Sequence, residues 1–195
     1  MAAADGVDVV VLPTADAFEH PQVAVDHAVA WFASIGARAS GLMVLNRRDA
    51  LDEAHVATVR AARFVYLVGD SPLHLRSVMK GTPVWAAVGE VLAGGGVVAA
   101  AGAAAAGICD PMTDPRGGAF TLGLALVRPL AIVNQAETWS HDRLHRTRQL
   151  ATGFPVATLP SGTALICTDG RWDTVGTGVE VTARCRADSR RSAGS

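Results

Sequence analysis

The residue types of a catalytic triad stand next to one another at Ser140, His141 and Asp142. A triad needs a hydroxyl nucleophile, an imidazole base and a carboxylate that meet in space. Adjacent residues of a helix point in different directions, so we interpret these three as the start of a helix. A second candidate nucleophile is the thiol of Cys109, which lies in an apolar stretch. For that position, a buried structural cysteine is the stronger interpretation.

Two further patterns could hold a metal ion or a phosphate. His141 and His145 are four residues apart, which places both imidazoles on one helix face. No zincin glutamate accompanies them, and three arginines of the same segment would repel a cation, so we predict a solvated basic face and no metal site. The Gly-rich turn at 94–96 precedes a strand and lacks the GK[ST] of a phosphate loop. His74 lies in a short apolar helix and is interpreted as a packing residue.

The loop 114–118 (DPRGG) is the most polar candidate binding feature. Arg116 could hold a carboxylate through two parallel hydrogen bonds, with Asp114 orienting the guanidinium. A Pro/Gly turn closed by an ion pair between the same two residues is an equally good interpretation, and the sequence leaves both open.

Alternating strands and helices should position these residues. Apolar runs bounded by turn residues predict strands at 9–12, 41–45, 64–68, 97–101, 129–133, 164–167 and 179–183, with a turn at 168–170. Helical spacing and capping residues predict helices at 21–36, 53–62, 73–79, 84–92 and 140–150. Asp52 and Thr82 are the expected N-caps of the second and fourth helices. This order predicts an α/β fold: a mostly parallel central sheet with helices on both faces, in a flavodoxin-like three-layer arrangement.

The longest uncharged stretch runs from Val91 to Cys109 and contains neither serine nor threonine. Its length is near that of a membrane span, but Ala and Gly dominate it and give little drive for insertion. A helix end, a glycine turn, a buried strand, a tight turn and a buried helix explain it better.

Length, composition and charge limit the classes of protein to which the chain could belong. The chain has 195 residues, half of them apolar, and a net charge of −1. We predict one domain over 1–185, followed by a disordered polar tail at 186–195. The near-neutral charge favours neither nucleic acid nor a membrane surface as partner. Three widely spaced cysteines predict no disulfide framework or zinc site, and the start MAAADGVDVVVLP is unlike a signal peptide, so we expect a cytoplasmic protein without cofactors.

Several motifs, in order along the chain, resemble the cyanophycinase and dipeptidase E family of serine peptidases, which has a class I glutamine amidotransferase-like fold. The stretches are 10–15 (VVLPTA), 66–75 (YLVGDSPLHL), 81–84 (GTPV), 109–112 (CDPM), 114–120 (DPRGGAF) and 162–165 (GTAL). The resemblance covers nearly all of the chain except the tail. Within the family, the chain looks like a member of a small actinobacterial-type branch. Members of this kind usually begin with an additional Gly-rich strand, so the resemblance implies that one sheet edge lacks its neighbour here.

The same resemblance implies the positions of a catalytic site. The family pattern G-x-S-A-G-A falls on 100–105 (AAGAAA), which places Gly102 at the serine position, followed by Ala103. The family histidine falls on Gln135, and the Gly-Gly pair of the oxyanion hole falls on Gly69 and Asp70. A carboxylate at that place would repel a developing oxyanion. Glutamine cannot carry a proton near neutral pH.

These changes together predict a catalytically degenerate member of the family. It would bind a peptide or small molecule, or act as partner of an active relative or of a second copy. Two alternatives stay open: an active hydrolase that uses Cys109 or a serine from elsewhere, and a decaying gene product without selected function. The predicted binding residues are Gly69, Asp70, Ala103, Asp114 and Arg116.

Overall fold

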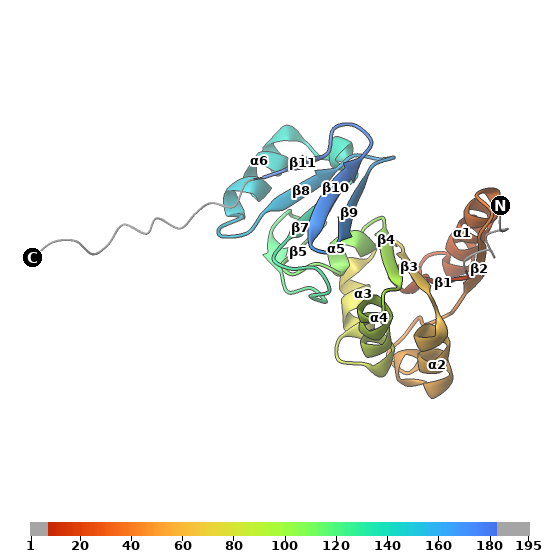
Figure 1. Cartoon of the computed structure of the whole chain (residues 1–195). Coiled ribbons are helices and arrows are strands. Elements are labelled where there is room, and N and C mark those ends of the chain that lie inside the picture. Colours follow the sequence, from red (N-terminus) through yellow and green to blue (C-terminus); the bar gives the residue numbers. More distant parts are fainter. Residues whose placement is uncertain (1–7, 183–195) are drawn as a thin grey trace, which may run out of the picture.

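A parallel sheet forms the centre of the computed structural model, which describes residues 8–182 (Figure 1). Its four strands lie in the order β2-β1-β3-β4, and every neighbouring pair is parallel. They are β1 (Asp8–Leu12), β2 (Arg38–Gly41), β3 (Phe64–Val68) and β4 (Val97–Ala101). The predicted α/β class with a mostly parallel central sheet is confirmed.

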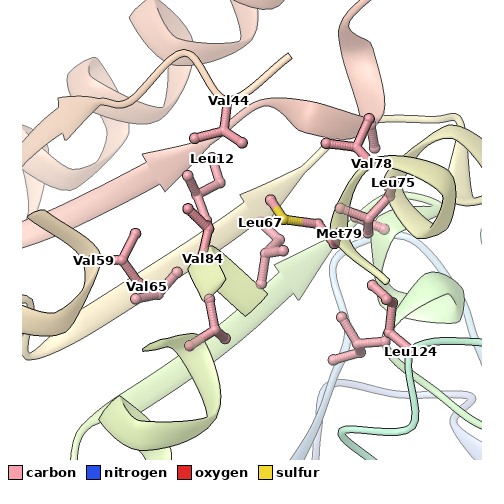
Figure 2. Packing of buried hydrophobic residues seen from close by; sticks show 14 of the residues in the cluster. Leu12, Val44, Val59, Val65, Leu67, Leu75, Val78, Met79, Val84 and Leu124 are labelled. Carbon is pink, nitrogen blue, oxygen red and sulfur yellow. The ribbon is translucent and has the colours of Figure 1, made fainter. Parts of the chain in front are cut away.

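Helices cover both faces of this sheet, and the side chains of β1 and β3 alternate between two buried clusters. Val9 and Val11 pack with Phe32 of α1 (Pro21–Ser34) on one face. Leu12 and Leu67 point to the other face, into the cluster shown in Figure 2. The helices of that face are α2 (Glu53–Ala61), α3 (Pro72–Met79) and α4 (Pro83–Ala93).

Both predicted N-caps are confirmed. Asp52 Oδ1 accepts hydrogen bonds from the backbone N–H groups of Ala54 at 2.8 Å and His55 at 3.3 Å. Thr82 Oγ1 accepts one from Trp85 N–H at 3.4 Å. These side chains satisfy donors that a helix start leaves without a partner, which is why α2 and α4 begin where the sequence predicted.

The second strand was predicted wrongly at 41–45. The structure ends β2 at Gly41, and the apolar residues after it form a partly buried loop in which Val44 is fully buried. Side chains from elsewhere satisfy this loop's backbone: Thr14 Oγ1 donates to the Val44 carbonyl at 2.7 Å, and His74 Nε2 lies 2.9 Å from the Leu45 carbonyl oxygen. An apolar run can therefore be buried as a loop, which periodicity alone does not distinguish from a buried strand.

The second half of the chain adds smaller sheets, at the top of Figure 1. Strands β7 (Ala131–Asn134), β8 (Val156–Leu159) and β11 (Glu180–Val181) form one, and β9 (Ala164–Thr168) with β10 (Arg171–Val175) form a hairpin. The short strands β5 (Met112–Thr113) and β6 (Phe120–Thr121) pair, and α6 (His141–Leu150) packs on the β7–β8 side. The sequence prediction missed β5, β6, β8 and β10. The solvent-exposed β10 lacks the apolar run by which strands were sought.

The uncharged stretch has the predicted order of elements: helix end, turn, β4, a tight turn, and then the short buried helix α5 (Ala104–Gly107). The strand was predicted to be buried, but β4 is half-buried, with Val97 exposed, because it is the edge strand of the sheet. Within residues 8–182, no helix is both long enough and apolar enough to span a membrane. The tail predicted to be disordered at 186–195 lies outside the described residues.

Two glycines of the loop after α5 give a matched test of this packing. A Cβ on Gly123 would overlap the carbonyl oxygen of Cys109, whereas a Cβ on Gly117 would meet nothing within 4 Å. Backbone atoms cannot move aside as a side chain can, so Gly123→Ala should lower the free energy of unfolding by at least about 2 kcal/mol. Gly117→Ala should change it by less than about 0.5 kcal/mol. Urea denaturation of both variants measures this, and equal effects would show that the loop does not lie against Cys109 as described.

Candidate functional site

The tight turn at the carboxyl end of β4 is the centre of the candidate site. Gly102 adopts a left-handed backbone there, with φ at +64°, between the strand and α5. A Cβ at this position would lie 2.9 Å from Asp70 Oδ1 and 3.0 Å from the Gly69 carbonyl oxygen. The left-handed backbone favours glycine here, and a side chain would in addition force the Asp70 carboxylate to move.

The neighbouring strand β3 supplies the residues that press on this turn. Gly69, with φ at +128°, follows β3, and a Cβ on it would lie 2.6 Å from the Ala15 carbonyl carbon. The backbone of the next residue, Asp70, is held in place by Asp16, because Asp70 N–H donates a hydrogen bond to Asp16 Oδ1 at 3.0 Å. The carboxyl ends of parallel strands meet at one edge of a sheet, so the third and fourth strands bring their turns together.

The backbone N–H groups at this edge are already engaged. Ala103 N–H makes a long hydrogen bond of 3.5 Å to Asp70 Oδ1, and Ala104 N–H donates to the Gly69 carbonyl at 2.9 Å. Stabilising an oxyanion requires N–H donors that point at the developing charge. In this arrangement the N–H groups of Asp70 and Ala103 both face carboxylate oxygens, so neither is free to hold an anion.

A cleft of about 500 Å³ opens beside Asp70, between α1 and the end of β3. Its walls combine carboxylates, imidazoles and aromatic rings: Asp16, Glu19, Asp70, His20, His27, Trp31 and Tyr66. Burial raises the pKa of Tyr66, so its phenol is neutral at physiological pH. The sequence analysis missed this cleft. The signal for it was the spacing of 20, 27 and 31, which places their side chains on one side of the first helix.

Gln135 lies at a second turn, directly after β7. Its backbone is left-handed, with φ at +48°, and it is exposed to solvent. Among residues 8–182, no hydrogen bond joins it to Gly69, Asp70, Gly102 or Ala103. The expectation that Gln135 shares a pocket with Gly102 stays a prediction.

Asp114 and Arg116 are engaged with each other. Arg116 Nε donates to Asp114 Oδ1 at 3.0 Å and Nη2 donates to Oδ2 at 2.8 Å, while the Arg116 backbone N–H also donates to Oδ1 at 2.9 Å. The guanidinium holds the pKa of the Asp114 carboxyl below its usual range. The observed geometry is thus the closed turn, and neither residue lines the cleft beside Asp70.

Cys109 has the environment of a structural cysteine. It is fully buried, and its thiol donates to the Ala105 carbonyl at 3.3 Å. Burial raises its pKa to about 12, so the nucleophilic thiolate is scarce at neutral pH.

Three histidines that the sequence singles out lie outside the cleft beside Asp70. The rings of His141 and His145 stack on the exposed face of α6, 6.3 Å apart. In the part of the chain that the structure describes, no group of three or more His, Cys, Asp or Glu residues could hold a metal ion. His74 contacts Phe18 edge-on, with 4.5 Å between ring centroids, besides its contact with the Leu45 carbonyl.

Comparison with known proteins gives similarity at the level of the fold. The structure resembles a peptidase from an acI-B1 Actinobacterium with a TM-score of 0.68 and 19% identity, over 92% of this chain and 82% of that one. It also resembles a putative peptidase E protein from Listeria monocytogenes EGD-e with a TM-score of 0.64 and 17% identity, over 95% and 90% of the two chains. No protein-family model matches the sequence, nor does any curated protein. The fold is therefore that of peptidase E structures.

The contact between Asp70 and Gly102 can be measured with a matched glycine. Gly81 is also left-handed, with φ at +67°, but a Cβ on it would meet nothing within 4 Å. Gly81→Ala should therefore lose about 1–2 kcal/mol from backbone strain alone. Gly102→Ala should lose more, because the new methyl group also displaces the Asp70 carboxylate.

The Asp70→Ala background isolates that extra cost. The effect of Gly102→Ala should be smaller there, with a coupling energy of about 0.5–1 kcal/mol in a double-mutant cycle of unfolding free energies. The effect of Gly81→Ala should be the same in both backgrounds. A coupling of zero between positions 70 and 102 would mean that the carboxylate does not occupy this turn.

The assignment of Cys109 as structural predicts its reactivity. In a Cys167→Ser/Cys185→Ser protein, iodoacetamide at pH 8 should leave native Cys109 unmodified and label it only in denaturant, because the thiol is buried and its pKa is raised to about 12. The Cys109→Ser/Cys185→Ser protein is the control, since exposed Cys167 should react in the native state. Mass spectrometry measures the extent of alkylation in both proteins. Rapid labelling of native Cys109 would contradict its structural role and make it a candidate nucleophile again.

Proposed function

We propose that this chain is a catalytically degenerate relative of the serine peptidases that serves as a ligand-binding module. One observation carries the proposal: a Cβ on residue 102 would lie only 2.9 Å from the Asp70 carboxylate, so an acidic group stands beside the position that a nucleophile would take. A nucleophile at such a turn needs its hydroxyl in the open, near a base and near free N–H donors. Here one acidic group stands beside the place of the side chain and engages the neighbouring N–H of Ala103.

The remaining chemistry supports the same conclusion. Gly102 and Ala103 offer no hydroxyl or thiol, and Cys109 is buried with a raised pKa. Gln135, at the position of the family histidine, has no proton-accepting nitrogen in the physiological range. A hydrolase with an unrecognised nucleophile is the competing function, and the activity test below separates the two.

The residues that line the cleft beside Asp70 favour a positively charged ligand. Three of its lining residues are carboxylates, and Trp31 and Tyr66 add aromatic surface. Carboxylates attract a cation, and aromatic faces bind one as well. We therefore propose a ligand with a positively charged end, such as the amino terminus of a short peptide or a small amine. A second copy of the chain, or an active relative, stays a further predicted partner.

The activity test uses the unmodified protein and a series of variants. The unmodified chain should not hydrolyse N-terminal aspartyl or β-aspartyl peptides and should not be labelled by a fluorophosphonate probe. Gly102→Ser alone should stay unlabelled, because the new hydroxyl meets Asp70 and has no base. Probe labelling should first appear when Gln135→His and Asp70→Gly are added. The matched control is the same triple variant with Gly102→Ala, which lacks only the hydroxyl.

The binding arm of this experiment is a calorimetric titration with short peptides that have free or acetylated amino termini. The free form should bind more tightly, and the preference should weaken in Glu19→Gln, where one cleft carboxylate loses its charge. Probe-sensitive hydrolysis by the unmodified chain would overturn the degenerate function in favour of an active hydrolase. Equal binding of the two peptide forms would overturn the cationic ligand alone.

A further inference from the structure

A second hollow, far more apolar than the cleft beside Asp70, lies between β4 and the β9–β10 hairpin. It has a volume of about 700 Å³. One wall is β4, the other is β9 with Trp172 of β10, and Ile108, Leu126 and Ile132 contribute to the space between. Asp169 is the one charged residue among those that line it. We call this hollow the β4–β9 groove.

Both walls of the β4–β9 groove are strand edges. β4 is the last strand of the four-stranded sheet, and β9 pairs with β10 on its other side. Within residues 8–182, neither strand has a ladder partner on the side of the groove. An edge strand presents a row of N–H and C=O groups that another strand can pair with. The groove is thus apolar in its side chains and bordered by peptide groups on two sides.

The register of β4 identifies which of its peptide groups face the groove. Val97 N–H donates to the Arg63 carbonyl on the β3 side. The peptide groups of successive residues alternate between the two sides of a strand. The N–H and C=O groups of Val98 and Ala100 therefore point away from β3, toward the groove.

Large apolar side chains gather around the same groove. Leu92 is 44% exposed, Val97 50%, Ile166 44% and Trp172 47%, and all four line it. Gathered apolar exposure of this kind marks a binding surface more often than isolated exposed residues do. An apolar peptide in an extended conformation would satisfy both the hydrophobic surface and the strand edges.

We infer that the β4–β9 groove binds one extended, uncharged apolar peptide strand of another protein, which pairs with the edge of β4 at Val98 and Ala100. This is β-strand addition, in which backbone hydrogen bonds give affinity and side-chain pockets give selectivity. A helix satisfies its own backbone, and a lipid chain has no peptide groups, so neither would use the two edges. The β9–β10 hairpin forms the wall opposite β4, so a whole second sheet could pair with β4 only by displacing the hairpin.

The chain's own residues are poorly suited to fill the groove. Every strand of residues 8–182 already pairs elsewhere. Of the two stretches outside these residues, 183–195 (ARCRADSRRSAGS) carries four arginines, for which the groove offers one carboxylate. The other, 1–7 (MAAADGV), has few large apolar residues. Charge therefore favours an uncharged strand from a partner.

The test is a titration of the full chain with a fluorescein-labelled peptide, Lys-Val-Thr-Val-Ile-Val-Thr-Lys, followed by fluorescence anisotropy. Its six middle residues are the uncharged strand, and the terminal lysines serve only to keep it in solution. The control peptide has the same side chains but N-methyl groups on alternate amides, so it cannot pair along one edge. The unmethylated peptide should bind at least about tenfold more tightly, since several hydrogen bonds worth about 1 kcal/mol each are lost by methylation. Equal affinities, or no binding at millimolar peptide, would overturn the inference.

One matched pair of protein variants and one further variant locate the site. Ile166→Lys puts a charge on the groove rim, whereas Val175→Lys puts the same charge on an exposed position of the same hairpin outside the groove. The first should weaken binding about tenfold or more by burying a charge, and the second should not. Val98→Pro removes an N–H that faces the groove without removing a bond to β3, and should weaken binding if the variant folds.

The outcomes of these variants are decisive even if Val98→Pro does not fold, because Ile166 and Val175 are exposed. Equal affinity of the two lysine variants would place the peptide elsewhere and overturn the inference. A dimer detected by sedimentation in the unmodified chain and lost in Ile166→Lys would assign the groove to a second copy and overturn it as well.

Discussion

The close approach of two turns, one after β3 and one after β4, is the constraint on which the candidate site depends. Ala104 N–H donates to the Gly69 carbonyl, and this bond locks the start of α5 against the end of β3. The approach is close enough that a side chain at position 102 would have to displace the Asp70 carboxylate. Because the sheet register pairs Val68 with Ala101, the two turns cannot separate without breaking the ladder between β3 and β4.

Asp70 takes part in hydrogen bonds through both its backbone and its carboxylate at this edge. Its backbone N–H is engaged by Asp16 from below, and its own carboxylate engages Ala103 N–H. An active hydrolase would leave such donors open and tolerate the resulting strain for the sake of catalysis. Filling them satisfies the donors, and a glycine at 102 adopts its left-handed backbone at little cost. The turn is thus arranged for stability, and the polar chemistry lies in the cleft beside it.

The two hollows of the molecule differ in the physics by which they could bind. The cleft beside Asp70 is lined by carboxylates, imidazoles and aromatic rings, so selectivity for a ligand there would come from charge. The β4–β9 groove carries apolar side chains between two strand edges, so selectivity there comes from backbone shape and hydrophobic burial. Strand β3 contributes to the first and β4 to the second. The same two strands therefore position both sites.

The sequence by itself determined the α/β class, the caps at Asp52 and Thr82, and strands β3 and β4, because these depend on local spacing and nearby hydrogen bonds. It also placed a tight turn at Gly102 within an otherwise apolar stretch. It misplaced β2, since tertiary contacts from Thr14 and His74 satisfy the backbone of the loop that was predicted as a strand. The position of the Asp70 carboxylate over Gly102, the acidic cleft and the facing edges of β4 and β9 were decided only by tertiary structure. Each of them joins residues that are distant in the chain, and the distance between such residues is set by sheet register and packing rather than by any local pattern.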